Sequence, residues 1–201
     1  MVSEKKIAFF DFDGTITRKD TLPEVIKFQK GKLAFYVGII IYAPLLVAYK
    51  LKLLKNDLVK QKILIYFFGG IPEPVFQEKC DLFAENMIPG LIRPGALKEI
   101  VSLREKGFEI VVISASAGNW IRRWSNELSL KLLSTKLEVK NGLITGRIEG
   151  KNNHGEQKVI NIRELWNLNE YGEIYAYGDS PGDKPMLALA TQSFYKPFRA
   201  I

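Results

Sequence analysis

The stretch KKIAFFDFDGTIT, residues 5–17, sets two carboxylates directly after a short apolar run. The run KIAFF, residues 6–10, has the length of a buried strand, and the turn residue Gly14 follows it. Asp11 and Asp13 therefore stand at the carboxyl end of this strand. Because ligands of parallel α/β sheets bind beyond the carboxyl ends of the strands, the stretch predicts a site as well as a strand.

Strands and helices are expected to alternate along much of the remaining chain. The runs FEIVVIS, residues 108–114, and EIYAY, residues 173–177, are apolar and of strand length. The segment PGALKEIVSLREKG, residues 94–107, has Pro near its start, apolar residues at helical spacing and a final Gly, which indicates a helix. This alternation predicts an α/β fold whose core is a Rossmann-like parallel sheet flanked by helices.

Two segments depart from the alternation. In KLEVKNGLITGRIEG, residues 136–150, Asn-Gly between two alternating runs predicts a β-hairpin at one side of the sheet. The stretch from residue 18 to 91 has no convincing buried strand and favours helices, with breaks expected at Pro44 and at FFGGIPEP. We therefore expect a core domain made of residues 1–16 and 92–201, and an inserted helical cap domain over residues 17–91.

Composition limits the class of protein. The 201 residues are 47% hydrophobic and 25% charged, as expected for a packed chain with one core and an insert. The net charge of +7 fits an anionic partner, but no recognition motif for DNA or RNA is present, so no nucleic-acid partner is expected. Cys80 is the single cysteine, which favours a reducing compartment, and no signal peptide is expected before the first strand. A cytoplasmic location is expected.

Chemically useful side chains follow the strand ends. The first strand delivers Asp11 and Asp13, the second ends at Ser114, and the third is followed by Asp179. Lys158 lies in a loop before another expected helix. Carboxylates gathered in this way repel one another and suit a hard divalent cation such as Mg²⁺.

A site of this composition can bind and transfer a phosphate. The metal attracts the phosphate, Lys158 and Ser114 can bind its remaining oxygens, and Gly14 lets backbone N–H groups turn toward the same anion. One carboxylate could attack phosphorus, because aspartyl-phosphate formation is a known form of nucleophilic catalysis.

The four segments DFDGTIT, Ser114, Lys158 and GDSPGD resemble, in order and spacing, the four motifs of the haloacid dehalogenase superfamily of phosphohydrolases. The resemblance covers essentially the whole chain. The insert resembles the helical C1-type cap of the phosphoserine-phosphatase-like branch, subfamily IB. One departure is SASAG after the second motif, where many phosphoserine phosphatases have glycines, and this departure puts phosphoserine specificity in doubt.

The resemblance implies a role for each matching residue. Asp11 matches the nucleophile, and Asp13 matches the general acid that later activates water. Ser114 and Lys158 match the binders of phosphate oxygens. The implied metal site is made by Asp11, the backbone carbonyl of Asp13, Asp179 and Asp183.

Plainer interpretations exist for several residues. Ser114 could simply cap the following helix, and Lys158 could be a surface lysine, with Lys151 as the nearest competitor for its role. His154 is expected to be a loop residue, because Asp13 already fills the role of the base. We expect three further side chains to pack within the protein: Trp120, Trp124 and Cys80.

The most apolar run, LAFYVGIIIYAPLLVAY, residues 33–49, has no charged residue, and lysines flank it on both sides. It reaches the lower limit of about 17 residues for a membrane span. A single crossing would separate the motif halves that must share one site, so a span is not expected. Two interpretations remain: a helical hairpin buried within the cap, or an apolar surface that contacts a membrane or an acyl chain.

The function expected from these observations is a Mg²⁺-dependent phosphatase that acts through an aspartyl phosphate. The substrate is expected to be a phosphorylated small molecule or lipid with a hydrophobic group. A hydrolase of small soluble phosphates, or a phosphotransferase with the same chemistry, is the alternative. A signalling receiver domain also uses acidic residues and Mg²⁺, but it lacks an equivalent of Asp13 and an inserted cap.

Overall fold

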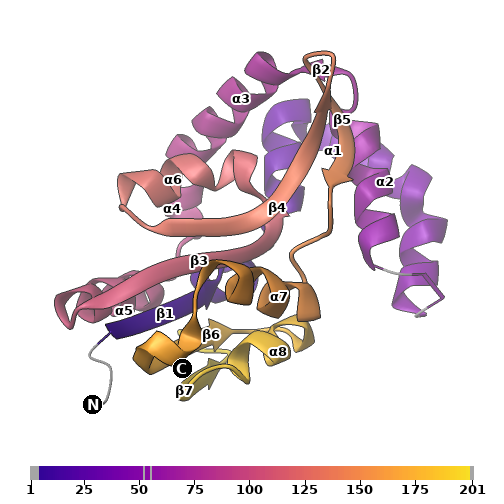
Figure 1. The fold of residues 1–201 in the computed structure, drawn as a ribbon. Helices are drawn as coiled ribbons and strands as arrows, with labels where there is room; N and C mark the ends of the chain where they lie inside the picture. The colour runs from indigo at the N-terminus through magenta and orange to yellow at the C-terminus, as the bar shows by residue number, and fades with distance from the viewer. Residues whose placement is uncertain (1–4, 52, 55, 200–201) are drawn as a thin grey trace.

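The computed structural model describes residues 5–51, 53–54 and 56–199, and its described part contains one seven-stranded sheet (Figure 1). The strand order is β2-β5-β4-β3-β1-β6-β7. The strands are β1 Lys5–Asp11, β2 Ile71–Pro72, β3 Phe108–Ala117, β4 Lys131–Lys140, β5 Leu143–Glu149, β6 Tyr171–Gly178 and β7 Gln192–Tyr195. The helices are α1 Thr21–Lys50, α2 Asn56–Phe68, α3 Glu73–Asn86, α4 Ile88–Leu91, α5 Pro94–Glu105, α6 Arg122–Glu127, α7 Glu156–Leu165 and α8 Lys184–Leu187.

The five strands β4, β3, β1, β6 and β7 are parallel, which confirms the predicted α/β core. The central strand β1 is buried on both faces. Its residues Ala8 and Phe10 pack in one apolar cluster, which includes Ile100 of α5. Ile7 and Phe9 pack in the other cluster, with Ile162 of α7. Alternate residues of β1 thus face opposite helical layers, as the two-residue period of a strand requires.

The predicted hairpin is present, and it pairs with β3 on one side and with β2 on the other. Strands β4 and β5 are antiparallel, and Asn141 and Gly142 of their turn have φ values of 53° and 72°. The first half of β4 pairs in parallel with β3, and its second half pairs with β5. The far edge of β5 pairs with the two-residue strand β2, which no feature of the sequence predicted. The hairpin therefore joins the sheet to the inserted segment.

The inserted segment is helical, as expected, in α1 to α4. The break expected at Pro44 is wrong, because α1 continues through this residue and bends instead at Gly31. Gly31 has φ 84°, a left-handed value that glycine adopts without strain. The chain enters and leaves the segment side by side, since Arg18 N donates to the carbonyl of Leu91 over 2.8 Å. The division into core and cap domains stays a prediction.

The expected packing residues lie in the interior. Trp120 is fully buried, and Trp124 packs against Phe12 with ring centroids 5.2 Å apart. Cys80 is also fully buried. The contact of Trp124 with Phe12 stabilises the turn that follows β1, and that turn carries Asp13 of the candidate site.

Candidate active site

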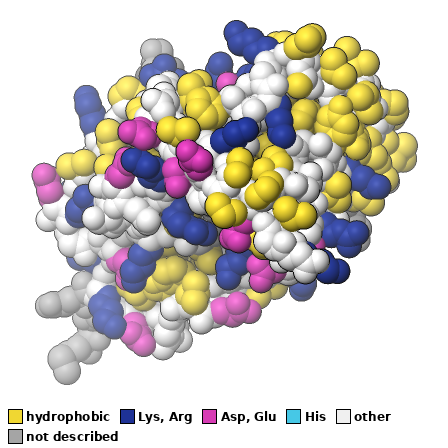
Figure 2. All heavy atoms as spheres, turned by 90° about the horizontal axis from the view of Figure 1, so that it is seen from above, with side chains coloured by type: hydrophobic (Ala, Val, Ile, Leu, Met, Phe, Trp, Pro, Cys, Tyr) yellow, Lys and Arg dark blue, Asp and Glu magenta, His cyan; other side chains and the backbone are white. Residues whose placement is uncertain are grey.

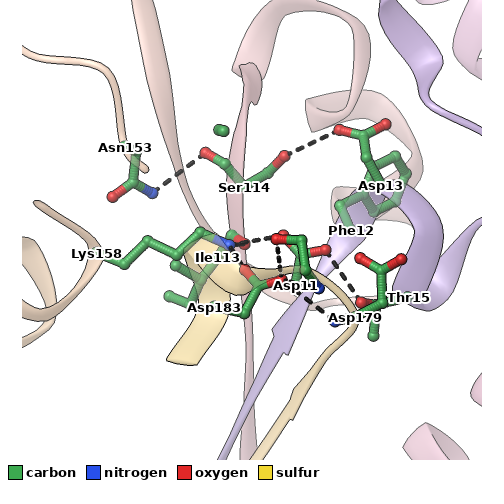
Figure 3. Close-up of polar contacts among 12 residues, drawn as sticks. Asp11, Phe12, Asp13, Thr15, Ile113, Ser114, Asn153, Lys158, Asp179 and Asp183 are labelled. Carbon is green, nitrogen blue, oxygen red and sulfur yellow. Dashed lines mark hydrogen bonds and ion pairs between the residues drawn. The ribbon is translucent and has the colours of Figure 1, made fainter. Parts of the chain in front are cut away.

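Asp11 lies at the end of β1 and forms a buried ion pair with Lys158 (Figure 3). The expected position of Lys158 in a loop is wrong, because this residue lies in the first turn of α7. The Lys158 Nζ is 2.6 Å from the Asp11 Oδ1 and 2.7 Å from the Asp183 Oδ1. The other Asp11 oxygen, Oδ2, accepts a hydrogen bond of 3.0 Å from the Thr15 hydroxyl. Burial raises the pKa of Asp11 to about 7, although Lys158 opposes this shift. The buried negative charge of Asp11 is therefore unfavourable by itself, and binding of a cation or of a phosphoryl group at this carboxylate would relieve it.

The side chain of Asp13 points away from this ion pair, toward the start of α1. Its Oδ1 accepts hydrogen bonds of 2.7 Å from Thr21 N and 2.6 Å from the Thr21 hydroxyl. Trp120 Nε1 donates to that same hydroxyl over 3.0 Å. The Asp13 carboxyl is therefore held in one orientation, two residues beyond Asp11. This position suits proton transfer to a group bound at Asp11 rather than contact with Asp11 itself.

Three carboxylates converge where β1 and β6 end. Oxygen atoms of Asp11, Asp179 and Asp183 lie within 4.8 Å of one another. Such a set of hard oxygen ligands fits Mg²⁺. The side chain of Asp13 is not in this cluster, so a contribution of Asp13 to a metal would have to come from its backbone carbonyl. Asp179 also accepts a hydrogen bond of 2.9 Å from Arg199.

The charges of the cluster are balanced unequally. The pKa of Asp179 is raised by burial and by the nearby Asp183. Burial also acts on Asp183, but Lys158 and the hydrogen bonds of Ser180 outweigh it and lower the pKa of Asp183. Burial alone would lower the pKa of Lys158, but the charges of Asp11 and Asp183 outweigh burial and raise this pKa. The ionised forms of the Lys158 ammonium and the Asp183 carboxylate are therefore mutually dependent.

Gly14 makes room for the cluster. It has φ 82°, and a Cβ placed on it would lie 2.5 Å from the Asp179 Oδ2. A side chain at this position would collide with a candidate metal ligand. The glycine of the DFDGT stretch is thus required for close approach of the first turn to the end of β6, as well as for the turn itself.

Ser114 is fully buried within β3, which continues to Ala117, and lies where the pairing with β4 shifts register. Its hydroxyl lies 3.5 Å from the Asp13 Oδ2 and accepts a 3.0 Å hydrogen bond from Ser116 N. Asn153 donates to the Ser114 carbonyl over 3.2 Å and to the Leu133 carbonyl over 2.9 Å. The amide of Asn153 therefore links β3 to β4 beneath the site.

Four of the seven predicted site residues border a cavity of about 300 Å³, whereas Gly14, Ser114 and Asp179 do not line it. Asp11, Asp13, Lys158 and Asp183 are in its polar wall, and His154 lies beside them in a loop. Leu22, Leu46, Tyr49, Val59 and Ile63 form an apolar wall contributed by α1 and α2. One side of the cavity thus suits a phosphate and a metal, and the other suits an apolar group.

Two charged residues of the cavity had not been singled out from the sequence. Asp20 caps α1, where it accepts a 2.9 Å hydrogen bond from Leu22 N. Burial and the charge of Asp13 raise the pKa of Asp20 to about 6. Lys60 of α2 donates to the carbonyl of Ala115 and, over 3.0 Å, to Asn152 Oδ1. The only available signal for Asp20 was its N-cap position, and Lys60 had none.

The comparisons with known proteins agree with this geometry. A family model for haloacid dehalogenase-like hydrolases matches residues 8–188. The chain belongs to this family. It is 32% identical over 201 residues to protein CicA of Caulobacter vibrioides strain NA1000, covering 99% of this chain and 89% of CicA.

Several solved structures share the fold. A protein of unknown function from Bordetella pertussis Tohama I has a TM-score of 0.80 at 20% identity, over 94% of this chain and 88% of that one. A phospho-aspartyl intermediate analogue of a phosphoserine phosphatase has a TM-score of 0.62 at 21% identity, over 94% and 85%. The chain is therefore a hydrolase of this family with a phosphoserine-phosphatase-like fold, as the four motifs predicted.

Proposed function

We propose that the protein is a Mg²⁺-dependent phosphatase that cleaves phosphate monoesters through a phosphoryl group on Asp11. The observation that carries this proposal is the arrangement around Asp11. Its carboxylate contacts the Lys158 ammonium and lies close to those of Asp179 and Asp183, and Thr21 holds the Asp13 carboxyl nearby. In a receiver domain the residue two positions after the phosphorylated aspartate has no such role, so Asp13 favours hydrolysis.

Two chemical steps follow from these positions. An oxygen of Asp11 attacks phosphorus, the bond from phosphorus to the ester oxygen breaks, and Asp13 gives that oxygen its proton. Asp13 then takes a proton from water, whose oxygen attacks phosphorus, and the bond to Asp11 breaks to release inorganic phosphate. Lys158 and Ser114 bind phosphate oxygens in both steps.

Mg²⁺ fits the oxygen atoms of Asp11, Asp179 and Asp183, which are 4.8 Å or less apart. When bound, the ion would offset the charge of the incoming phosphate and of these carboxylates. The protein supplies the orientation: Thr15 holds one oxygen of Asp11, and Ser180 holds one oxygen of Asp183.

The apolar wall of the cavity supports a substrate with a hydrophobic group. Leu46 and Tyr49 of α1 face the same cavity as Asp11 and Asp13. A small polar substrate such as phosphoserine would leave this wall without a partner. We therefore favour a hydrophobic phosphate monoester, and small soluble phosphates or transfer to an acceptor other than water are the alternatives.

Trapping the intermediate tests the proposal. Protein incubated with Mg²⁺ and para-nitrophenyl phosphate is quenched in acid, and peptide mass spectrometry locates the phosphoryl group. We expect it on Asp11, and we expect Asp11→Asn to lose both the label and turnover. Asp81→Asn, a matched change outside the site, should keep both. A label on another residue, or full activity of Asp11→Asn, would contradict the mechanism.

A substrate series separates the alternatives. Hydrolysis of an alkyl phosphate is compared with that of phosphoserine at equal concentration of Mg²⁺. A higher kcat/KM for the alkyl phosphate supports the hydrophobic substrate, and a strong preference for phosphoserine contradicts it. Adding alcohol acceptors and measuring new phosphate esters against inorganic phosphate distinguishes a phosphotransferase.

A further inference from the structure

The apolar run of α1 is exposed in the structure, not buried. Among the described residues, α1 is the one helix long and apolar enough to cross a membrane, and its most apolar window has a mean hydropathy of 1.8 but is only 6% buried. The interpretation as a buried hairpin is therefore wrong. A helix of such composition in a water-soluble domain is normally covered, because water-exposed apolar surface is unfavourable.

The exposed side chains form a stripe along α1. Positions 33, 37, 40, 44, 47 and 51 alternate spacings of four and three, which places them on one side of the helix. Leu33 is 80% exposed and Ile40 is 72% exposed. Figure 2 shows hydrophobic side chains gathered at the end of the molecule where α1 and α2 lie. We call this surface the α1 stripe, and its apolar members are Leu33, Val37, Ile40, Pro44, Val47 and Leu51.

The opposite side of α1 is already occupied by α2. Gly38 is buried there, and a Cβ on it would lie 2.3 Å from the Phe67 ring. The rings of Tyr42 and Tyr66 contact each other across the same pair of helices, with centroids 5.3 Å apart. Because α2 packs against the other side of α1, it cannot also cover the α1 stripe. Covering the stripe requires a surface outside the described chain.

Charge indicates what that surface is. Residues 27–62 contain eight lysines and one acidic residue, Asp57, a net charge of +7. The remaining residues carry 21 basic and 21 acidic side chains, so residues 27–62 account for the whole net positive charge of the protein. Lys30 and Lys32 at one end of the stripe, and Lys50 at the other, are exposed. Lysines at both ends of an apolar helix suit a helix that lies along an anionic lipid surface.

A second copy of this chain fits the stripe less well. A symmetric pair through the α1 stripe would bring two segments of charge +7 together, and like charges across an interface are repulsive. An anionic bilayer accepts both the apolar stripe and the lysines.

We propose that the α1 stripe docks on an anionic lipid bilayer and sets the mouth of the active-site cavity against it. Leu46 and Tyr49 line the cavity, and their neighbour Val47 lies in the stripe. Resting on the phosphatase function proposed above, this places the apolar wall beside the membrane. The substrate is then a phosphate monoester whose apolar group stays in the bilayer while its phosphate reaches Asp11.

Vesicle sedimentation tests the docking. The full chain is mixed with vesicles of phosphatidylcholine, with and without phosphatidylserine. We expect binding to the anionic vesicles that weakens with salt, and a loss of about tenfold or more in Val37→Glu/Ile40→Glu, since burial of both stripe residues in the bilayer is lost. Lys30→Glu/Lys32→Glu should also weaken binding. Leu165→Glu, a matched change of an exposed residue on α7, should bind like the wild type.

Two activity measurements separate this proposal from the phosphatase function. Hydrolysis of soluble para-nitrophenyl phosphate should be equal in wild type and Val37→Glu/Ile40→Glu, because neither residue lines the cavity. Hydrolysis of lysophosphatidate in anionic vesicles should fall about tenfold in the variant, in line with its lost binding. Vesicle binding without any Mg²⁺-dependent hydrolysis would overturn the phosphatase function and leave the docking standing. Absence of vesicle binding, unchanged binding by the variant, or a solution dimer that buries Ile40 would overturn the docking.

Discussion

The Lys158 ammonium lies 2.6 Å from the carboxylate of Asp11, and both side chains are almost completely buried. Asp183 is the second partner of the same ammonium, at 2.7 Å. One lysine thus compensates two buried carboxylates at the end of the sheet. A metal ion bound to Asp11, Asp179 and Asp183 would add positive charge to the same cluster.

Lys158→Met is expected to destabilise the metal-free protein by about 3–5 kcal/mol, because removing one member of a buried ion pair leaves the other uncompensated. Added Mg²⁺ should restore more stability to Lys158→Met than to the wild type, since the ion can replace part of the lost positive charge. Urea unfolding with and without Mg²⁺ measures both effects. Lys151→Met, a change of an exposed lysine in the preceding loop, should alter neither. An equal response of the variant and the wild type to Mg²⁺ would contradict this assignment of charge.

Gly14→Ala is expected to weaken Mg²⁺ binding by about tenfold or more, because binding through a displaced carboxylate loses a charged ligand contact. The added methyl group would lie 2.5 Å from the Asp179 Oδ2. Gly150→Ala is the matched control, with φ 72° and no neighbouring atom within 4 Å. The control should lose only about 1 kcal/mol of stability from the left-handed backbone. The Mg²⁺ dependence of hydrolysis and urea unfolding separate the two effects.

Asp13→Asn should slow turnover by about 10²–10⁴-fold, the usual contribution of a general acid or base. An amide can still accept the hydrogen bonds from Thr21, so the fold of the turn should be kept. With para-nitrophenyl phosphate, whose leaving group needs little protonation, the phosphoryl group should accumulate on Asp11. Quench experiments on the millisecond scale would show it. Faster loss of the label than in the wild type would contradict the role of Asp13 as base.

Local patterns predicted the sheet and much of the site because each signal lies within a few residues. The apolar run before Asp11 and the Asn141-Gly142 turn are complete in themselves. Side chains that orient these residues are far away in the sequence: Trp120 reaches Thr21, and Arg199 reaches Asp179. Such contacts depend on packing and leave no periodic signal.

For the segment 33–49, the sequence did not predict whether the apolar side chains are buried or exposed. Its composition predicted a helix and an apolar surface, but composition alone cannot tell a helix covered by its neighbours from one that is exposed. The expected break at Pro44 does not occur, because α1 continues through this exposed position, and the non-helical residue within α1 is Gly31.

Lys60 leads to a prediction about pH. It extends from α2 into the cavity wall, and burial lowers its pKa to about 8. Asp13, Asp20 and Asp57 oppose that shift, while Lys158 adds to it. The unfolded chain holds this proton up to its ordinary pKa of about 10.4. Between these two values the unfolded state binds more protons, so the contribution of Lys60 makes the folded state more stable as pH rises.

Lys60→Met removes this contribution. The difference in unfolding free energy, wild type minus variant, should therefore shift in favour of the wild type between pH 8 and 10.5 by up to roughly 3 kcal/mol, at about 1.4 kcal/mol per pKa unit. Comparing two proteins cancels the titration of tyrosines and other lysines, which both share. Urea unfolding at several pH values gives the difference, and Lys62→Met, a change of an exposed lysine on the same helix, should show no such shift. A constant difference for Lys60→Met would mean that the ammonium remains hydrated in the cavity wall.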